Sequence, residues 1–181
     1  MSIQRIITDL KLQLHDRGVD WMVVGGWALA AHGVARQTFD LDVVIAKADG
    51  RKAEAALETC GYALLGRSAL MSRYRSSTPG SPDIDVLAID PATMATLGKE
   101  AIITALGSEN IRVPTLMHLL AMKIHAFKSD PTRRTKDVSD IVSLVRANGV
   151  SPSSEEFHSL CAKYGSEELW KEIVALAKTW P

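Results

Sequence analysis

"VGGWALAAHGVARQTFDLDVVIA", residues 24–46, decides the fold of this chain. A short apolar segment ends in Gly25-Gly26, a helix-like run follows at once, and Asp40 and Asp42 then stand within a second apolar segment. The stretch therefore predicts strand, glycine turn, helix and strand in succession. Because side chains alternate along a strand, both carboxylates share one face, and we expect a positive charge between them.

The segment "DIDVLAID", residues 83–90, repeats this pattern, with Asp83 and Asp85 on one face of a further strand. If the two strands are neighbours, an aspartate of the second lies roughly 5 Å from the first pair. Two like charges at that distance repel by about 3 kcal/mol at an effective dielectric of 20. Either one carboxylate is protonated or a divalent cation binds, and hard oxygen ligands suit Mg²⁺. Carboxylates solvated on a strand are the alternative for the Asp40–Asp42 pair taken alone.

Composition bounds the domain count and the compartment. The chain has 181 residues, is 46% hydrophobic, and carries 21 basic and 21 acidic side chains, so its formal net charge is zero. This fits one domain, or a core with a helical appendage, and argues against a general polyanion binder. Cys60 and Cys161 have no paired spacing, which predicts a reducing, cytoplasmic location. We find no signal-peptide pattern and no run long enough to cross a bilayer, so we expect no membrane partner.

Strand and helix patterns alternate up to Val113, and the sequence after Pro114 is helical in character. We therefore predict an α+β protein: a mixed β-sheet core flanked by helices over residues 1–113, then an all-helical C-terminal subdomain over residues 114–181 that packs on the core. The expected strands lie at residues 20–24, 39–46, 62–67, 70–76 and 83–90, with a small strand pair at 101–106 and 110–114. The expected helices lie at residues 2–17, 27–33, 49–60, 115–129, 135–149, 153–165 and 166–180, with a short one opened by Pro91.

The Gly25-Gly26 turn has two interpretations. Without Cβ atoms its backbone N–H groups can approach a ligand closely, and the N-terminus of the following helix favours phosphate. The pattern is neither a Rossmann fingerprint nor a P-loop, so a plain tight turn is an equal alternative. Arg36, just before the aspartates, either meets a triphosphate or neutralises the carboxylates. We interpret Thr38 as structural.

These segments resemble a known superfamily. "GGWALAAHGVARQTFDLDVVI" followed by "DIDVL" is similar to the nucleotidyltransferases with the DNA polymerase beta-like fold, whose pattern is h-G-G/S, then D/E-h-D/E, then h-D/E-h. The pattern falls on Gly25, Gly26, Asp40, Asp42 and Asp85. Downstream, "MKIHAF…RRTKDVSDIVSL" resembles the Lys and Lys-Asp-x-x-Asp motifs of the AbiEii-type branch, which includes toxins of toxin–antitoxin systems. The resemblance covers roughly residues 20–145, and this chain is shorter than many AbiEii toxins.

The resemblance implies metal-dependent transfer of a nucleoside monophosphate from a nucleoside triphosphate to an acceptor hydroxyl, with pyrophosphate as leaving group. Two Mg²⁺ ions, with Mn²⁺ as the alternative, would be held by Asp40 and Asp42, and one of them also by Asp85. One ion would orient the phosphates and the other would lower the pKa of the acceptor hydroxyl. Asp85 is then the candidate general base, and the glycine pair would bind the β- and γ-phosphates. Asp83 is a lesser ligand candidate.

A second group of charged residues lies in the helical half. Lys123 stands beside the apolar face of its expected helix, and Asp137 and Asp140 are three residues apart on one face of the next helix. In the functional interpretation Lys123 binds the triphosphate, and Asp137 lies in the catalytic site and orients Lys123. The alternative is an interhelical salt bridge plus a solvated aspartate. The basic segment "RRTK", residues 133–136, either grips a phosphate or RNA, or is a solvated loop.

The acceptor stays open at this stage. It is a transfer RNA or other RNA end, a protein side chain, or a small molecule such as an antibiotic hydroxyl; a toxin role would add an antitoxin partner. The competing class is a catalytically inactive nucleotide- or partner-binding module of the same fold. The complete set of motif carboxylates argues against that class, because a degenerate copy is free to lose any of them.

Overall fold

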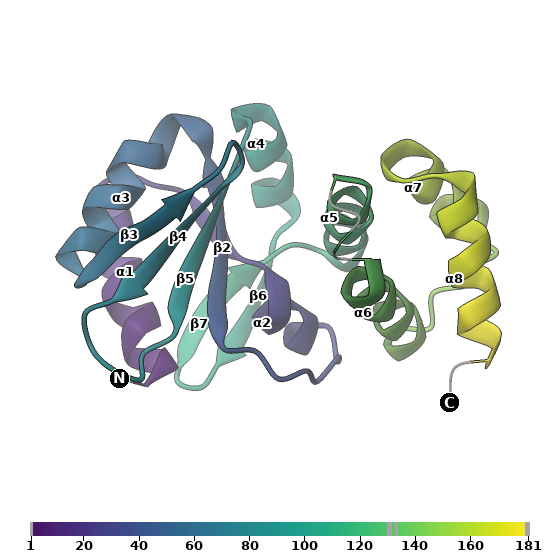
Figure 1. Ribbon diagram of the computed structural model, residues 1–181, viewed down its shortest axis with the longest axis horizontal. Helices are drawn as coiled ribbons and strands as arrows, with labels where there is room; N and C mark the ends of the chain where they lie inside the picture. The colour runs from purple at the N-terminus through teal and green to yellow at the C-terminus, as the bar shows by residue number, and fades with distance from the viewer. Residues whose placement is uncertain (1, 130–131, 133, 180–181) are drawn as a thin grey trace. The chain divides into compact units, whose positions relative to one another are not determined.

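The computed structural model describes residues 2–129, 132 and 134–179, and Figure 1 shows the course of the backbone. Helices and strands alternate in the first part: α1 (Ile3–Asp16), β1 (Trp21–Val23), α2 (Gly25–Ala31), β2 (Asp40–Ala46), the 3-10 turn η1 (Lys47–Asp49), α3 (Gly50–Thr59), β3 (Tyr62–Arg67), β4 (Met71–Ser76), β5 (Asp83–Ile89), α4 (Pro91–Glu100), β6 (Ile102–Leu106) and β7 (Glu109–Val113). Helices follow: α5 (Leu116–Ser129), α6 (Arg134–Ala147), α7 (Glu155–Tyr164) and α8 (Glu167–Thr179).

A mixed five-stranded sheet organises the first part, in the order β1-β2-β5-β4-β3. Strands β2 and β5 are parallel neighbours, and the other pairs are antiparallel. Their register sets Asp40 opposite Asp83 and Asp42 opposite Asp85, so the two aspartate-bearing strands adjoin, as expected. Strands β6 and β7 form a separate antiparallel pair. The predicted α+β class with a mixed sheet is confirmed.

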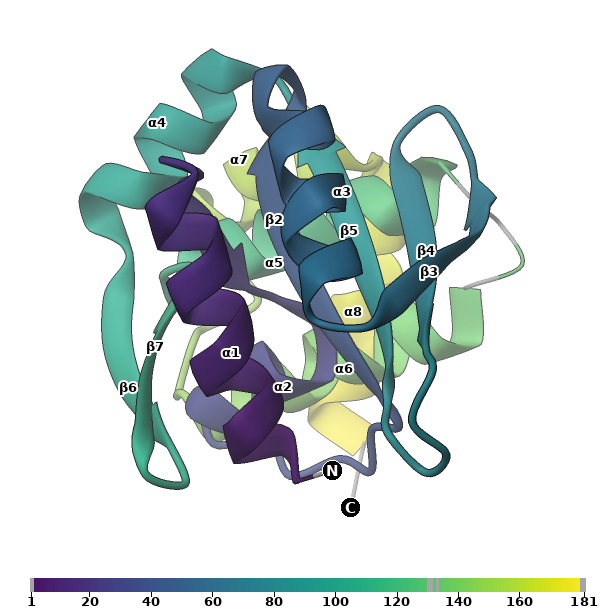
Figure 2. The same cartoon turned by 90° about the vertical axis from the view of Figure 1, so that its left-hand side faces the viewer.

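Apolar side chains cover one face of this sheet. Leu41 and Ile84 are fully buried and, because residues alternate along a strand, point away from the aspartates beside them. Helices α1 and α3 lie together on one side of the sheet (Figure 2), and α1 buries Ile6, Leu10 and Leu14. Each buried side chain of this size stabilises the fold by about 1.5–3 kcal/mol. The apolar interior thus fixes the strands that carry the aspartates.

Helix α2 starts closer to β1 than the sequence pattern predicts. It begins at Gly25 rather than Trp27 and ends at Ala31. Gly25 has φ +61°, in the left-handed region that glycine enters at low cost. The chain therefore turns from β1 into α2 without an intervening loop. Helix α4 does begin at Pro91, as predicted, and the Asp90 side chain caps it by accepting a hydrogen bond from the Thr93 backbone N–H at 2.9 Å.

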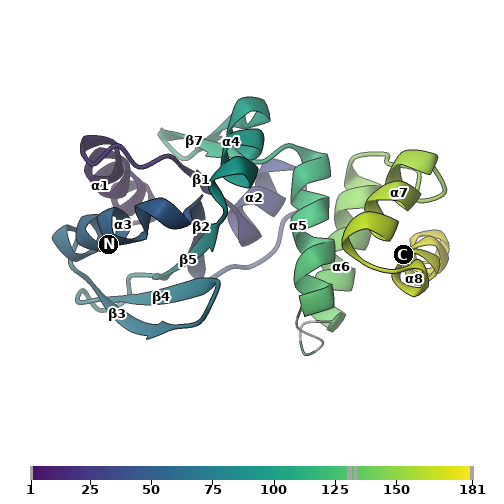
Figure 3. The same ribbon diagram turned by 90° about the horizontal axis from the view of Figure 1, so that it is seen from above.

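The chain divides into two compact units. The first contains both sheets and is built from the segments up to Ala31 and from Arg36 to Thr115. The second contains residues 32–35 and the chain from Leu116 onward, and its helices α5 to α8 pack on one another (Figure 3). The packing of the helical subdomain on the core stays a prediction. Among the described residues, no helix is both long and apolar enough to span a bilayer.

Candidate functional site

Three carboxylates converge on the face of the sheet opposite Leu41 and Ile84. Asp40 and Asp42 stand at the start of β2, and Asp85 lies beside them on β5. Each offers one oxygen, and these oxygens lie within 4.8 Å of one another. Asp85 is only 5% exposed, and the other two are half-buried, so water screens their mutual repulsion incompletely. The structure thus brings together the residues predicted to hold the metal, and their role as ligands stays a prediction.

The Asp42 carboxylate lies directly against the backbone of Gly25. A Cβ atom on Gly25 would lie 1.8 Å from Asp42 Oδ2, so no other residue fits there without displacing the carboxylate. The backbone ties the same two segments together, because the Val24 N–H donates to the Asp42 carbonyl oxygen at 2.9 Å. The sequence interpretation assigned the missing Cβ to phosphate approach or to a plain turn. The structure adds a third reason for glycine, which is room for a carboxylate of the site.

Gly26 makes room for Thr38, and Thr38 in turn contacts the Asp40 carboxylate. A Cβ on Gly26 would lie 2.6 Å from Thr38 Oγ1. The Thr38 hydroxyl donates to Asp40 Oδ1 at 2.8 Å and fixes the orientation of that carboxylate. The structural role expected for Thr38 is therefore exerted on a member of the site. Phosphate binding by the glycine pair stays a prediction.

Arg73 is the residue of this site that the sequence analysis missed. It lies on β4 directly opposite Asp85 and contacts both carboxylate oxygens, Nε to Oδ1 at 2.7 Å and Nη2 to Oδ2 at 2.5 Å. The bidentate contact and the charge of Asp85 raise the pKa of Arg73 above its ordinary value. Asp83, the lesser ligand candidate, contacts Arg75 instead, at 3.3 and 3.4 Å. Arg73 thus supplies a positive charge at Asp85, whereas the positive charge expected between Asp40 and Asp42 stays a prediction.

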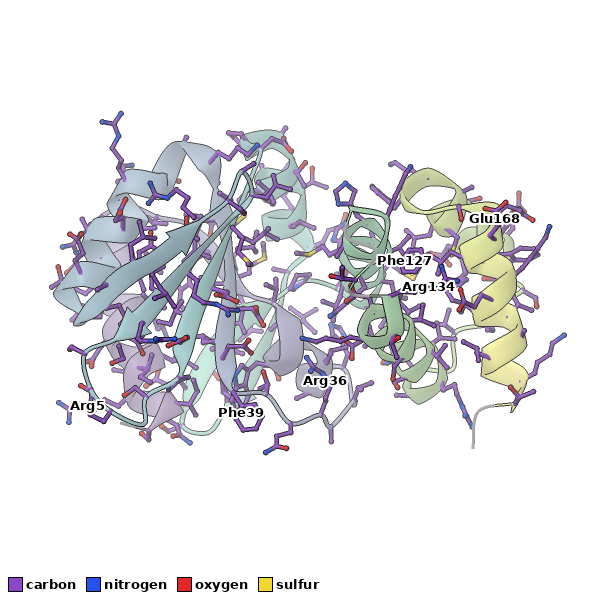
Figure 4. All side chains as sticks on the ribbon, in the orientation of Figure 1. Arg5, Arg36, Phe39, Phe127, Arg134 and Glu168 are labelled. Carbon is purple, nitrogen blue, oxygen red and sulfur yellow. The ribbon has the colours of Figure 1, made fainter. Side chains whose placement is uncertain are left out.

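Arg36 and an open hollow complete the description of the first unit. Arg36 lies half-buried between α2 and β2, and its predicted contact with a triphosphate or with the carboxylates stays a prediction. A hollow of about 420 Å³ adjoins the site and shares Asp40 with it. Its lining residues are Ile3, Trp27, Thr38, Phe39, Asp40, Gly80, Ser81 and Pro82. Phe39 (Figure 4) is 77% exposed and contributes an apolar side chain to the lining of this hollow.

Lys123 forms a buried charge cluster within the helical unit. Its ammonium nitrogen lies 2.7 Å from Asp140 Oδ2 and 3.4 Å from Asp137 Oδ1. The three side chains are 8%, 3% and 0% exposed in that order. The salt bridge between α5 and α6 is therefore present, but the expectation of a solvated aspartate is wrong, because both carboxylates are buried. A role of Lys123 and Asp137 in nucleotide binding stays a prediction.

The basic segment at residues 133–136 is partly engaged. Arg134 pairs with Glu172 at 2.5 Å and lies over the Phe127 ring, 5.1 Å from its centroid (Figure 4). Lys136 is exposed on α6. Arg133 lies outside the described residues. Because Arg134 is already paired with Glu172, it is less available to bind a phosphate or RNA. The predicted phosphate or RNA contact of this segment stays a prediction.

The fold is similar to that of several solved structures. The antibiotic-resistance factor ANT(2'')-Ia matches with a TM-score of 0.60 at 14% identity, covering 99% of this chain and 94% of that one. The lincosamide antibiotic adenylyltransferase LnuA matches with a TM-score of 0.55 at 15% identity, covering 80% and 96%. A nucleotidyltransferase-like protein from Paracoccidioides brasiliensis matches with a TM-score of 0.56 at 18% identity, covering 98% and 93%. At these identities the likeness shows the fold.

Sequence comparison gives the family. A family described as "Uncharacterised nucleotidyltransferase" matches residues 1–181, and the chain belongs to it. No sequence among the curated proteins matches the chain. The resemblance to the nucleotidyltransferase superfamily is thereby confirmed, whereas membership of the AbiEii-type branch stays a prediction.

Proposed function

We propose that the protein is a metal-dependent nucleotidyltransferase, which moves a nucleoside monophosphate from a nucleoside triphosphate to an acceptor hydroxyl and releases pyrophosphate. The observation that carries this proposal is the meeting of Asp40, Asp42 and Asp85 within 4.8 Å on one face of the sheet. Family membership supports the same reaction class. A binding module without chemistry would not require glycines fitted around Asp42 and around the threonine that holds Asp40.

The donor set fits a hard divalent cation. All three side chains present carboxylate oxygens from adjoining strands, which suits Mg²⁺, with Mn²⁺ as the alternative. We propose two ions, both held by Asp40 and Asp42, and one of them also by Asp85. Bound there, they would neutralise phosphate charge and lower the pKa of the acceptor hydroxyl.

The side chains of the site divide the remaining work. Asp85 would accept the proton of the acceptor hydroxyl as general base, because it is the carboxylate expected beside only one ion. Thr38 keeps Asp40 turned toward the site through its hydroxyl. The backbone N–H groups of Gly25 and Gly26 would bind the phosphates, and Arg36 is a further candidate for that contact.

A small-molecule hydroxyl is the acceptor we favour. ANT(2'')-Ia has been solved with adenylyl-2''-tobramycin, and LnuA is a lincosamide adenylyltransferase solved with lincomycin, so two structures with this fold hold antibiotic acceptors or their products. The zero net charge of the chain also disfavours a large RNA interface. Transfer to an RNA end by a toxin with a cognate antitoxin is the second candidate, and it rests on the Lys-Asp-x-x-Asp resemblance alone.

Labelling separates these acceptors. The protein is incubated with each α-labelled nucleoside triphosphate and Mg²⁺ in a host lysate, which is then divided into RNA, protein and small-molecule fractions. We expect label in the small-molecule fraction, lost in Asp42→Asn and on chelation of the metal. Label in RNA would favour the toxin candidate. No metal-dependent label in any fraction, together with triphosphate binding that Asp42→Asn leaves unchanged, would support the inactive module instead.

A further inference from the structure

Arg73 occupies the oxygens that a metal ion would need. Its guanidinium contacts Asp85 through two donors, at 2.7 and 2.5 Å, so each oxygen of that carboxylate already accepts a charge-assisted hydrogen bond. The cation therefore neutralises part of the charge that would otherwise attract a divalent ion.

The two partners differ in their freedom to move. The Asp85 side chain is 6% exposed and stands in the middle of β5, between β2 and β4. The Arg73 side chain is 44% exposed and is long and flexible. If a metal ion is to bind Asp85 closely, the arginine is the partner that can leave. A guanidinium displaced in this way stays within a side-chain length of the carboxylates and needs a new anion.

We propose that Arg73 holds Asp85 as a counter-cation until a divalent ion binds there, and that the guanidinium then binds the triphosphate of the nucleotide. This inference rests on the proposed function, because it requires the metal ions and the triphosphate. The metal affinity of the site at Asp85 is then low in the free protein, and it becomes high once phosphate oxygens accept hydrogen bonds from Arg73. Metal and triphosphate thereby assist each other through one side chain, and such coupling is reciprocal.

The neighbouring pair provides a matched control. Arg75 lies on the same strand and face and contacts Asp83 in the same bidentate manner, at 3.3 and 3.4 Å. Asp83 does not belong to the group of converging carboxylates found among the described residues. Arg75→Gln therefore removes an equivalent charge from the same face without freeing one of the three converging carboxylates.

Two binding measurements test the proposal without any turnover. Free Mn²⁺ is counted by electron paramagnetic resonance while the full chain is titrated, and inorganic tripolyphosphate is then titrated by calorimetry at saturating Mn²⁺. We expect Arg73→Gln to raise the affinity for the more weakly bound Mn²⁺ ion about tenfold relative to the unchanged protein. The same variant should lower the affinity for tripolyphosphate about tenfold. Arg75→Gln should match the unchanged protein in both. Arg73→Lys keeps the charge and loses the fork, and should lie between them.

The opposite signs distinguish this role from a structural one. If Arg73 only supports the fold, both affinities fall together in Arg73→Gln and recover in Arg73→Lys, and the proposal is wrong. It is also wrong if Arg73→Gln and Arg75→Gln behave alike. A failure of the proposed function has a different signature: no Mn²⁺ binding at all, or binding that Asp42→Asn leaves unchanged. Should Arg73→Gln fail to fold, the comparison of Arg73→Lys with Arg75→Lys decides by the same opposite signs.

Discussion

The carboxylate of Asp42 lies in the space where the side chain of Gly25 would begin. A Cβ on Gly25 would stand 1.8 Å from Asp42 Oδ2, far inside any real contact distance. The glycine that turns the chain from β1 into α2 and the aspartate of β2 therefore form one unit, although they are far apart in sequence. The absence of a side chain at Gly25 therefore determines where the Asp42 carboxylate can lie.

Gly25→Ala should disrupt the arrangement of the carboxylates in addition to destabilising the fold. The substitution places a side chain in the left-handed region, at φ +61°, which costs roughly 1–2 kcal/mol, and it also drives the Asp42 carboxylate aside. We expect transferase activity to fall at least about a hundredfold and Mn²⁺ binding to weaken markedly. Calorimetric Mn²⁺ titration and the labelling assay measure the two effects.

Gly18→Ala is the matched control for backbone strain. Gly18 has the same φ of +61°, and a Cβ there would meet nothing within 4 Å. It should therefore cost the same stability in urea unfolding while leaving Mn²⁺ binding and activity unchanged. Equal loss of metal binding in both variants would mean that strain, and not contact with Asp42, explains the effect of Gly25→Ala.

Regular spacing made part of this architecture predictable. The convergence of Asp85 on Asp40 and Asp42 was implied by the superfamily resemblance and was otherwise conditional on the two strands being neighbours. The alternation of Asp40 and Asp42 with apolar residues, repeated at Asp83 and Asp85, predicted both strands and the shared face of each aspartate pair. Those properties depend on nearest neighbours in sequence and on the period of a strand. The helical half was predictable for the same reason, because the apolar period there is that of a helix.

The missed features depend on register and on tertiary packing. Arg73 meets Asp85 only because β4 pairs with β5 in one antiparallel register, and a slip of one residue would turn Arg73 to the other face. The burial of Asp140 could not be derived from its polarity, since it becomes favourable only once Lys123 lies 2.7 Å away. In each case the partner comes from another element of the structure.

Thr38→Val should impair the reaction with little change in stability. Valine keeps the shape of threonine but cannot donate to Asp40 Oδ1, where the hydroxyl now lies at 2.8 Å. Released from that contact, the carboxylate samples orientations that do not face the site. We expect kcat to fall about tenfold, as for the loss of a ligand-orienting hydrogen bond. Thr38→Ser keeps the hydroxyl and should restore most of the activity; if it does not, packing against Gly26 is the role of this residue.

Because Cys161 is buried, we expect the stability of the helical unit to fall at alkaline pH. Burial raises the pKa of this thiol from 9.0 to about 12, with a smaller effect of Glu167. The folded state thus retains the proton better than the unfolded chain does. The resulting stabilisation is fully present below pH 9 and is lost as pH rises from 9 to about 12. Urea unfolding across this range should show a shallower fall for Cys161→Ala than for the unchanged protein, and identical slopes would contradict the assignment.

Lys123→Met tests whether the buried cluster stabilises the helical unit. The change keeps the length of the side chain but removes the cation that contacts both Asp137 and Asp140, and those carboxylates are 0% and 3% exposed. Removing one partner of a buried ion pair typically costs about 3–5 kcal/mol. We expect a loss of that order in urea unfolding, partly recovered when Asp140→Asn is combined with Lys123→Met. Lys171→Met, which removes an exposed i,i+4 pair with Glu167, should change stability by less than about 1 kcal/mol. If Lys123→Met instead leaves stability intact and lowers triphosphate affinity, the nucleotide-binding role predicted from sequence is the correct one.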